Sequence, residues 1–176
     1  GLYFLEDTFN NKPPKHLTTF VDFVKEFINF ASNRSSGAVG LPNLIPYMYY
    51  FWKQDWNAAY LGMTQFEDYA RQNIQRFIYA VNQPCVRDGQ QSAFTNTSVF
   101  DREYLVALFG GAEFPNGEFM IDHIEGIMEF QKMYMEVMAD IRHENMFTFP
   151  VSSISLLRKN KEFKDEECAC WAIRHN

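Results

Sequence analysis

Two strand-like segments separated by one long amphipathic helix constrain the fold of this chain more than any other feature. The segments are the polar run 90–102 and the run 146–157. Between them, apolar residues recur at helical spacing from about residue 120 to residue 142. The inner face of that helix is expected to consist of Ile121, Ile124, Ile127, Met128, Tyr134, Met138 and Ile141. A connection of this length permits a crossover between parallel strands, so the sequence predicts a βαβ unit in an α/β fold.

The polar run 90–102 places hydroxyl and amide side chains on a segment with strand patterning. Gly89 can form a turn before it, Asp101 is placed to cap a helix over 103–109, and Gly110 is placed to end that helix. The run is typical either of a polar site or of the solvent face of an edge strand, and the pattern leaves both interpretations open. The second segment repeats the theme with hydroxyls at Ser152, Ser153 and Ser155.

The remaining helices follow from apolar periodicity and from breakers. They are expected over 16–34, 44–52, 64–81 and 164–175, and the two-glycine segment 35–40 is expected to be a loop. Thr64 and Glu67 have the spacing of a capping box at the start of the third of these helices. The sequence therefore predicts a helix-rich α/β chain without repeats or an internal domain boundary.

Composition limits the classes of partner. Hydrophobic residues make up 47% of the 176 residues and aromatic residues 17%, spread along the chain as in a piece of a larger body. The net charge of −6 argues against a nucleic-acid groove, and no stretch approaches the roughly 20 apolar residues of a membrane span. Three cysteines without framework spacing indicate a reducing compartment, so we expect a cytoplasmic protein.

The residues alone do not predict a catalytic or metal site. The pair His143-Glu144 has no second histidine four positions later, and Cys168 and Cys170 are two apart on a predicted helix, so their sulfurs would diverge. No nucleophile elbow, phosphate loop or dinucleotide fingerprint is present. We therefore expect no metal, and the residues alone predict an α/β domain with polar strands.

Four stretches resemble anaerobic (class III) ribonucleoside-triphosphate reductases. Residues 89–96 resemble the Gly-x-Gln-Ser-x-Phe-Thr-Asn strand of that family, and the stretches 40–52, 119–122 and 146–157 agree with it. The resemblance runs from about residue 40 to the C-terminus. It implies part of a ten-stranded α/β barrel of the glycyl-radical enzyme type. In that family a finger-loop cysteine, oxidised to a thiyl radical by a glycyl radical, abstracts hydrogen from the ribose.

By this resemblance residues 1–176 form a single segment of the catalytic barrel. It would lack the N-terminal nucleotide-binding cone, the finger-loop cysteine and the glycyl-radical region, and would be inactive alone. The segment would carry no cofactor, because the glycyl radical lies elsewhere in the complete enzyme. The expected partners are the rest of the reductase, a radical-SAM activase and a nucleotide substrate, with a homodimer as the complete enzyme.

The resemblance also selects candidate substrate-binding residues on the polar run. They are Gln91, Ser92, Thr95 and Asn96, of which Asn96 matches the strand asparagine of the family most directly. Side chains of a strand alternate, so only some of the four can face one cavity. An alternative of a different class is a non-catalytic α/β binding or scaffold module derived from the same barrel.

Overall fold

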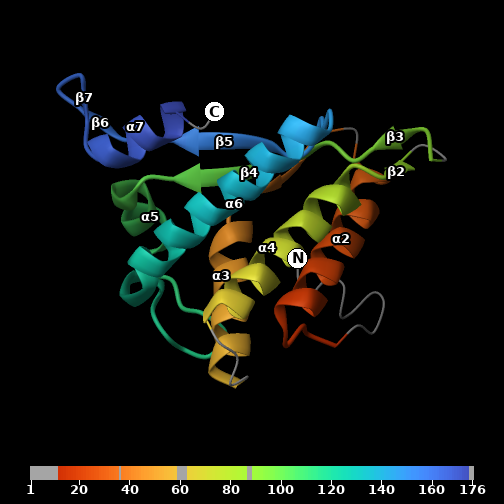
Figure 1. Cartoon of the computed structure of the whole chain (residues 1–176), viewed down its shortest axis with the longest axis horizontal. Coiled ribbons are helices and arrows are strands. Elements are labelled where there is room, and N and C mark those ends of the chain that lie inside the picture. The colour runs from red at the N-terminus through yellow and green to blue at the C-terminus, as the bar shows by residue number, and fades with distance from the viewer. Residues whose placement is uncertain (1–11, 36, 59–62, 87–88, 175–176) are drawn as a thin grey trace.

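The computed structural model of this chain describes residues 12–35, 37–58, 63–86 and 89–174 (Figure 1). In chain order the helices are α2 (Leu17–Ser32), α3 (Leu44–Ala58), α4 (Met63–Val81), α5 (Arg102–Phe109), the short 3-10 helix η1 (Met120–His123), α6 (Ile124–Glu144) and α7 (Glu166–Arg174). The strands are β1 (Val39–Leu41), β2 (Pro84–Val86), β3 (Gln91–Ser92), β4 (Thr95–Phe100), β5 (Val151–Ser155), β6 (Arg158–Lys159) and β7 (Glu162–Phe163).

A parallel sheet of three strands in the order β1-β4-β5 forms the centre of the described chain. Both strand pairs are parallel, with Gly40 opposite Asn96 and Ser98 opposite Ser153. The crossover from β4 to β5 contains α6, so the predicted βαβ unit is confirmed. The pairs β2-β3 and β6-β7 are short antiparallel ribbons outside this sheet. The fold is thus mixed α/β and rich in helix. The described residues form one three-stranded sheet and two short ribbons, which do not by themselves show a ten-stranded barrel.

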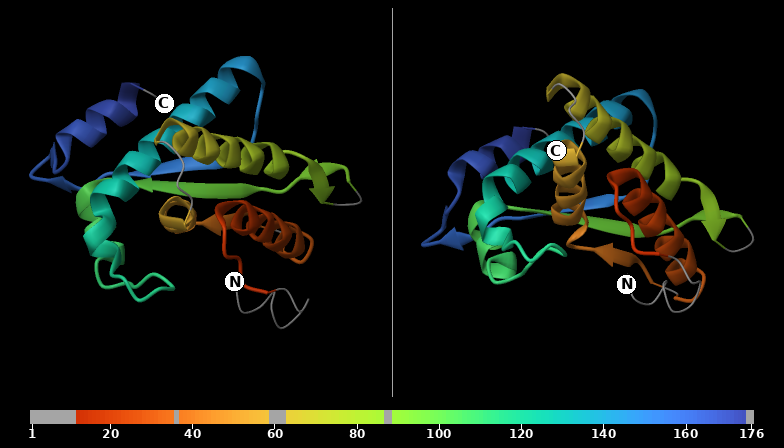
Figure 2. Two further views of the ribbon diagram at one scale, coloured as in Figure 1. Left: turned by 60° about the horizontal axis from the view of Figure 1, so that its bottom comes forward. Right: turned by 90° about the horizontal axis from the view of Figure 1, so that it is seen from below.

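The helices α3, α4 and α6 lie on one side of β4 and β5 (Figure 2, right). They pack against one another through aromatic side chains: the Trp52 and Phe130 rings lie 5.6 Å apart, and the Trp52 indole donates a hydrogen bond to the Phe66 carbonyl. Phe66, Phe77 and Tyr134 are fully buried. This core accounts for much of the aromatic content, because large rings fill the space between helices and sheet.

Most predicted elements are confirmed, including the cap of α5. The Asp101 carboxylate accepts a hydrogen bond from the Tyr104 N–H at 2.7 Å, and Gly110 follows the last residue of α5. The prediction is wrong for Ile121, which is 47% exposed, whereas the other six residues of the expected inner face are buried. The reason is that Ile121 lies in η1, where three residues per turn move it off the face that α6 buries.

The strands differ more from expectation than the helices do. The strand expected over 146–157 is shorter in the structure and consists of β5 alone. Pro150, which directly precedes β5, has no N–H to donate to a neighbouring strand, and Met146 is fully exposed. The polar run divides into β3 and β4. The expected loop 35–40 contains the start of β1, which has three residues and exists through its pairing with β4. The expected cap at Thr64 lies outside the side chains that the structure describes.

Candidate functional site

The two faces of β4 differ in their surroundings. Thr95 and Thr97 are fully buried toward the helices, whereas Asn96 and Ser98 are half-buried and point to the other face of the sheet. Alternation along the strand produces this division. The side chains of two predicted site residues, Thr95 and Asn96, therefore point to opposite faces of the sheet and cannot line the same cavity.

We call the second face the polar sheet face and define it by Gly40, Asn96, Ser98 and Ser153. The Asn96 side-chain amide donates a hydrogen bond of 2.9 Å to the Ser153 hydroxyl across the two strands. Gly40 lies beside Asn96 on the next strand, and a Cβ placed on it would meet nothing within 4 Å. The backbone next to Asn96 is therefore open to close approach by another molecule or segment.

The chemistry of this face is hydrogen bonding without charge. Ser98 and Ser153 carry hydroxyls that can donate and accept, and the Asn96 carboxamide has an oxygen that can accept. Such groups can orient the hydroxyls of a sugar. They do not by themselves transfer protons or electrons at neutral pH.

A buried polar layer supports the sheet from the helix side. The Thr97 and Ser152 hydroxyls lie 3.2 Å apart, and the Tyr134 hydroxyl donates to Thr97 at 3.5 Å. Burial raises the pKa of the Tyr134 phenol far above its usual value, so the group stays a neutral donor. Ser152, one of the three serines of the second segment, belongs to this layer, whereas Ser153 belongs to the polar sheet face.

Gln91 and Ser92 lie apart from Asn96. They line a groove of about 380 Å³ at the C-terminal end of α2, together with Asn33 and Arg34. Gln91 is exposed, and the Ser92 hydroxyl donates a hydrogen bond of 2.7 Å to the Asn82 carbonyl. The four predicted residues thus occupy three places: this groove, the polar sheet face and, for Thr95, the buried side of β4.

Two polar residues that sequence reasoning did not select hold these elements together. Gln131 in α6 is buried, and its carboxamide both accepts from the Phe100 N–H and donates to the Phe100 carbonyl, each at 2.9 Å. A signal was present in the sequence, because Gln131 interrupts the apolar face of α6 at the spacing of Met128 and Tyr134.

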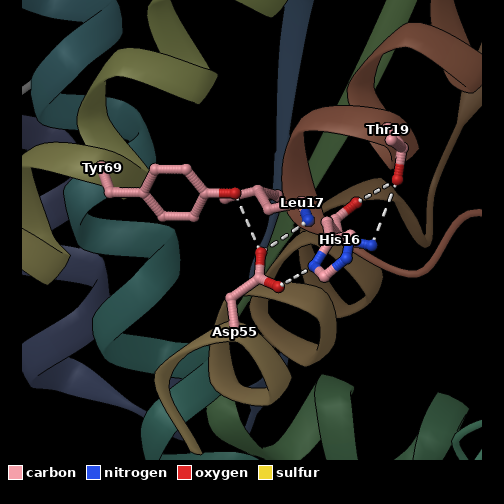
Figure 3. Close-up of polar contacts among 5 residues, drawn as sticks. All are labelled: His16, Leu17, Thr19, Asp55 and Tyr69. Carbon is pink, nitrogen blue, oxygen red and sulfur yellow. Dashed lines mark hydrogen bonds and ion pairs between the residues drawn. The ribbon is translucent and has the colours of Figure 1, made fainter. Parts of the chain in front are cut away.

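The second is Asp55 in α3, whose carboxylate joins three helices (Figure 3). It accepts hydrogen bonds from the His16 imidazole at 2.6 Å, from the Leu17 N–H at 2.9 Å and from the Tyr69 hydroxyl at 2.9 Å. Burial, and then the bond to Asp55, raise the pKa of Tyr69 above its usual 10.0, so its phenol remains a donor. Asp55 therefore caps α2 from another helix. The only sequence signal for this role is a carboxylate within an aromatic run, which does not identify the helix that it caps.

Metal and thiol chemistry find little support in the described residues. Across these ranges, no three His, Cys, Asp or Glu side chains gather closely enough to hold a metal ion. Cys168 is buried, and burial raises the pKa of its thiol to about 11, which leaves it unreactive at neutral pH. Cys170 is exposed and Cys85 is half-buried. Among the helices described, none is both long enough and apolar enough to cross a bilayer.

The fold and the polar sheet face define a segment of an α/β protein with an uncharged hydrogen-bonding surface. The family model described as anaerobic ribonucleoside-triphosphate reductase matches residues 1–174, and the chain belongs to that family. The sequence motifs indicated a resemblance only from about residue 40 onward, whereas the family model also matches the residues before it. No curated protein matches the chain.

Solved structures of the family are similar over most of this chain. The anaerobic ribonucleotide reductase from Thermotoga maritima in complex with dATP and CTP is 41% identical with a TM-score of 0.89, covering 94% of this chain and 27% of that one. A structure of the same reductase with dATP in the specificity site has the same identity and TM-score, covering 94% and 28%. Another, described as anaerobic ribonucleotide reductase, is also 41% identical at 0.89, covering 94% and 26%. The chain thus spans about a quarter of the length of these reductases.

Proposed function

We propose that this chain is part of the catalytic body of an anaerobic ribonucleoside-triphosphate reductase and that its polar sheet face lines the chamber for the ribonucleotide. The observation that supports this most is the Asn96–Ser153 hydrogen bond beside the open backbone of Gly40. It places a fixed amide and a hydroxyl where a sugar could approach. The segment would act only with the rest of the reductase, because it spans about a quarter of its relatives.

In this proposal the chain orients the substrate and excludes water from it. Asn96 contacts a ribose hydroxyl directly, while Thr95 supports the strand from the buried side. Gln91 and Ser92 remain predicted contacts, for a part of the nucleotide that reaches the groove beside Arg34. Hydrogen bonds fixed before the reaction are effective because they do not have to be reorganised during it.

The radical chemistry belongs to other parts of the complete enzyme. A glycyl radical outside this segment, formed by a radical-SAM activase, would supply the oxidising step. The described cysteines do not suit a radical relay on the polar sheet face, since none of them lies on it. We further propose that the complete enzyme is a cytoplasmic homodimer that supplies deoxyribonucleotides for DNA replication.

The test uses the complete reductase polypeptide that carries this segment, with its activase, under anaerobic conditions. The wild-type protein should convert a ribonucleoside triphosphate to its deoxy product. Asn96→Ala should lower kcat/KM about twofold to tenfold, as expected when an uncharged hydrogen bond of about 0.5–1.5 kcal/mol to the transition state is lost. Asn57→Ala, on the exposed end of α3, is the matched control and should leave the rate unchanged.

Each outcome decides one part of the proposal. Failure of the folded wild-type protein, treated with its activase, to form any deoxynucleotide would favour the scaffold module. Reduction at full rate by Asn96→Ala would place the substrate elsewhere and refute the role of the polar sheet face.

A further inference from the structure

Gln131 makes a contact that resembles a strand pairing. Its side chain is 2% exposed, and it lies on the face of α6 that packs on the sheet. Its carboxamide meets both the N–H and the C=O of Phe100 at 2.9 Å. A carboxamide has the same donor and acceptor as a peptide group, so it can take the place of one in a sheet.

The backbone of β4 explains why Phe100 needs such a partner. Successive residues of a strand inside a parallel sheet direct their N–H and C=O to alternate neighbours. The Val39 N–H donates to the Phe94 carbonyl, so Phe94 faces β1, whereas the Asp101 N–H donates to the Ser155 carbonyl, so Asp101 faces β5. Phe100 is six residues after Phe94 and therefore faces the side of β1.

On that side β1 has already ended. Its last residue, Leu41, pairs with Thr97, so no residue of β1 lies opposite Phe100. A backbone group that is buried without a hydrogen-bond partner destabilises the fold, and Phe100 is buried. Gln131 satisfies both groups and extends the pairing of β4 by one position.

We infer that Gln131 is a positioning residue for the polar sheet face, an inference that rests on the proposed function. Gln131 ties the C-terminal end of β4 to α6, and that strand carries Asn96 and Ser98. The next residue, Asp101, secures the same end on the other side, since its carboxylate accepts from the Tyr104 N–H and from the Leu157 N–H. Small shifts of a strand held in this way would move the groups that orient the ribose.

The decisive variant is Gln131→Glu, which keeps the shape of the side chain. An ionised carboxylate has no hydrogen to donate and would face the Phe100 carbonyl, whereas the protonated acid restores one donor and one acceptor. Burial raises the pKa of such a carboxyl, so both forms can be reached in the pH range of an assay. The protonated form is the competent one, and activity should therefore return as the pH falls.

The experiment compares kcat and KM of the complete, activated reductase at pH 8 and pH 6. Gln131→Glu should lose about tenfold to a hundredfold in kcat at pH 8 with little change in KM, which is the scale expected for misplaced catalytic groups. Most of the loss should disappear at pH 6. Gln131→Met cannot form the pair and should be equally slow at both pH values. Gln75→Glu, the same change on the exposed face of α4, should match wild type.

All rates are divided by the wild-type rate at the same pH. This ratio removes the contribution of other titratable groups on the surrounding elements, among them Asp101 beside Phe100, Tyr104 stacked on it, Lys132 and buried Tyr134 on α6, and Cys168 on α7. The folded fraction of each variant is measured by thermal unfolding at both pH values, so that a loss of folded protein is not counted as a loss of rate.

The results separate this inference from the proposed function. A wild-type enzyme that reduces nucleotides, with a Gln131→Glu variant whose relative rate is normal or independent of pH, would overturn the positioning role alone. A loss that disappears after correction for the folded fraction would also overturn it, because Gln131 would then be merely structural. Absence of product from the wild-type enzyme would overturn the proposed function itself.

Discussion

Replacing Asp55 by alanine tests how the helices beside the sheet are held together. The substitution removes an acceptor that α2, α3 and α4 share (Figure 3). Leu17, whose N–H lies at the start of α2, is fully buried, so this donor would lose its cap without gaining water. The His16 side chain is 62% exposed and can be solvated instead.

The magnitude follows from these three contacts. Loss of a helix cap costs about 0.5–2 kcal/mol. Loss of the Tyr69 hydrogen bond costs about 0.5–1.5 kcal/mol, and the ion pair with the exposed His16 side chain contributes at most about 1 kcal/mol. We therefore expect Asp55→Ala to lower the free energy of unfolding by about 1–4.5 kcal/mol. In a chain of this size that corresponds to a fall in Tm of about 2–18 °C.

The assay is urea and thermal unfolding of the 176-residue chain, followed by circular dichroism. His16→Ala, which removes only the exposed partner, should cost less than about 1 kcal/mol. Tyr69→Phe should fall between the two variants. A cost for His16→Ala as large as that for Asp55→Ala would refute the reasoning, because the ion pair and not the cap would then supply the stability.

Three further predictions concern other parts of the fold. Asp101→Ala should lower the free energy of unfolding by about 1–3.5 kcal/mol in the same urea experiment, because it uncaps α5 and leaves the half-buried Leu157 N–H without its acceptor; a cost below about 0.5 kcal/mol would contradict this. Gly126→Ala should destabilise α6 despite the better helix propensity of alanine, since its Cβ would lie 2.5 Å from the Tyr49 hydroxyl oxygen; a higher Tm would show that Tyr49 moves freely. Burial raises the pKa of the Cys168 thiol from 9.0 to about 11. Cys168 should therefore react with iodoacetamide at pH 8 far more slowly than exposed Cys170, as measured by peptide mass spectrometry. Equal labelling of the two cysteines would contradict the burial of Cys168. Because the folded state keeps this thiol protonated, its contribution to stability is complete below about pH 9 and is lost as the pH rises toward 11.

Local signals in the sequence determined the helices, the Asp101 cap, the parallel crossover and the resemblance to the reductase family. These features could be predicted because each depends on neighbouring residues: periodicity selects a helix, and a short polar side chain before it caps it. The polar run was predicted as one strand, but only its second part joined the sheet. Three-residue β1 could not be found in this way, because its pairing partner lies more than 50 residues away.

Only the tertiary structure decided which polar groups share a surface. Thr95 and Asn96 are neighbours in the sequence and lie on opposite faces, while Asn96 meets Ser153 from a strand 57 residues later. The residues that hold this arrangement are equally remote: Asp55 caps a helix 38 residues earlier, and Gln131 pairs with a strand 31 residues earlier. A sequence pattern records what each residue prefers locally. Which distant group satisfies a buried carboxylate or carboxamide depends on how the packed helices and strands meet.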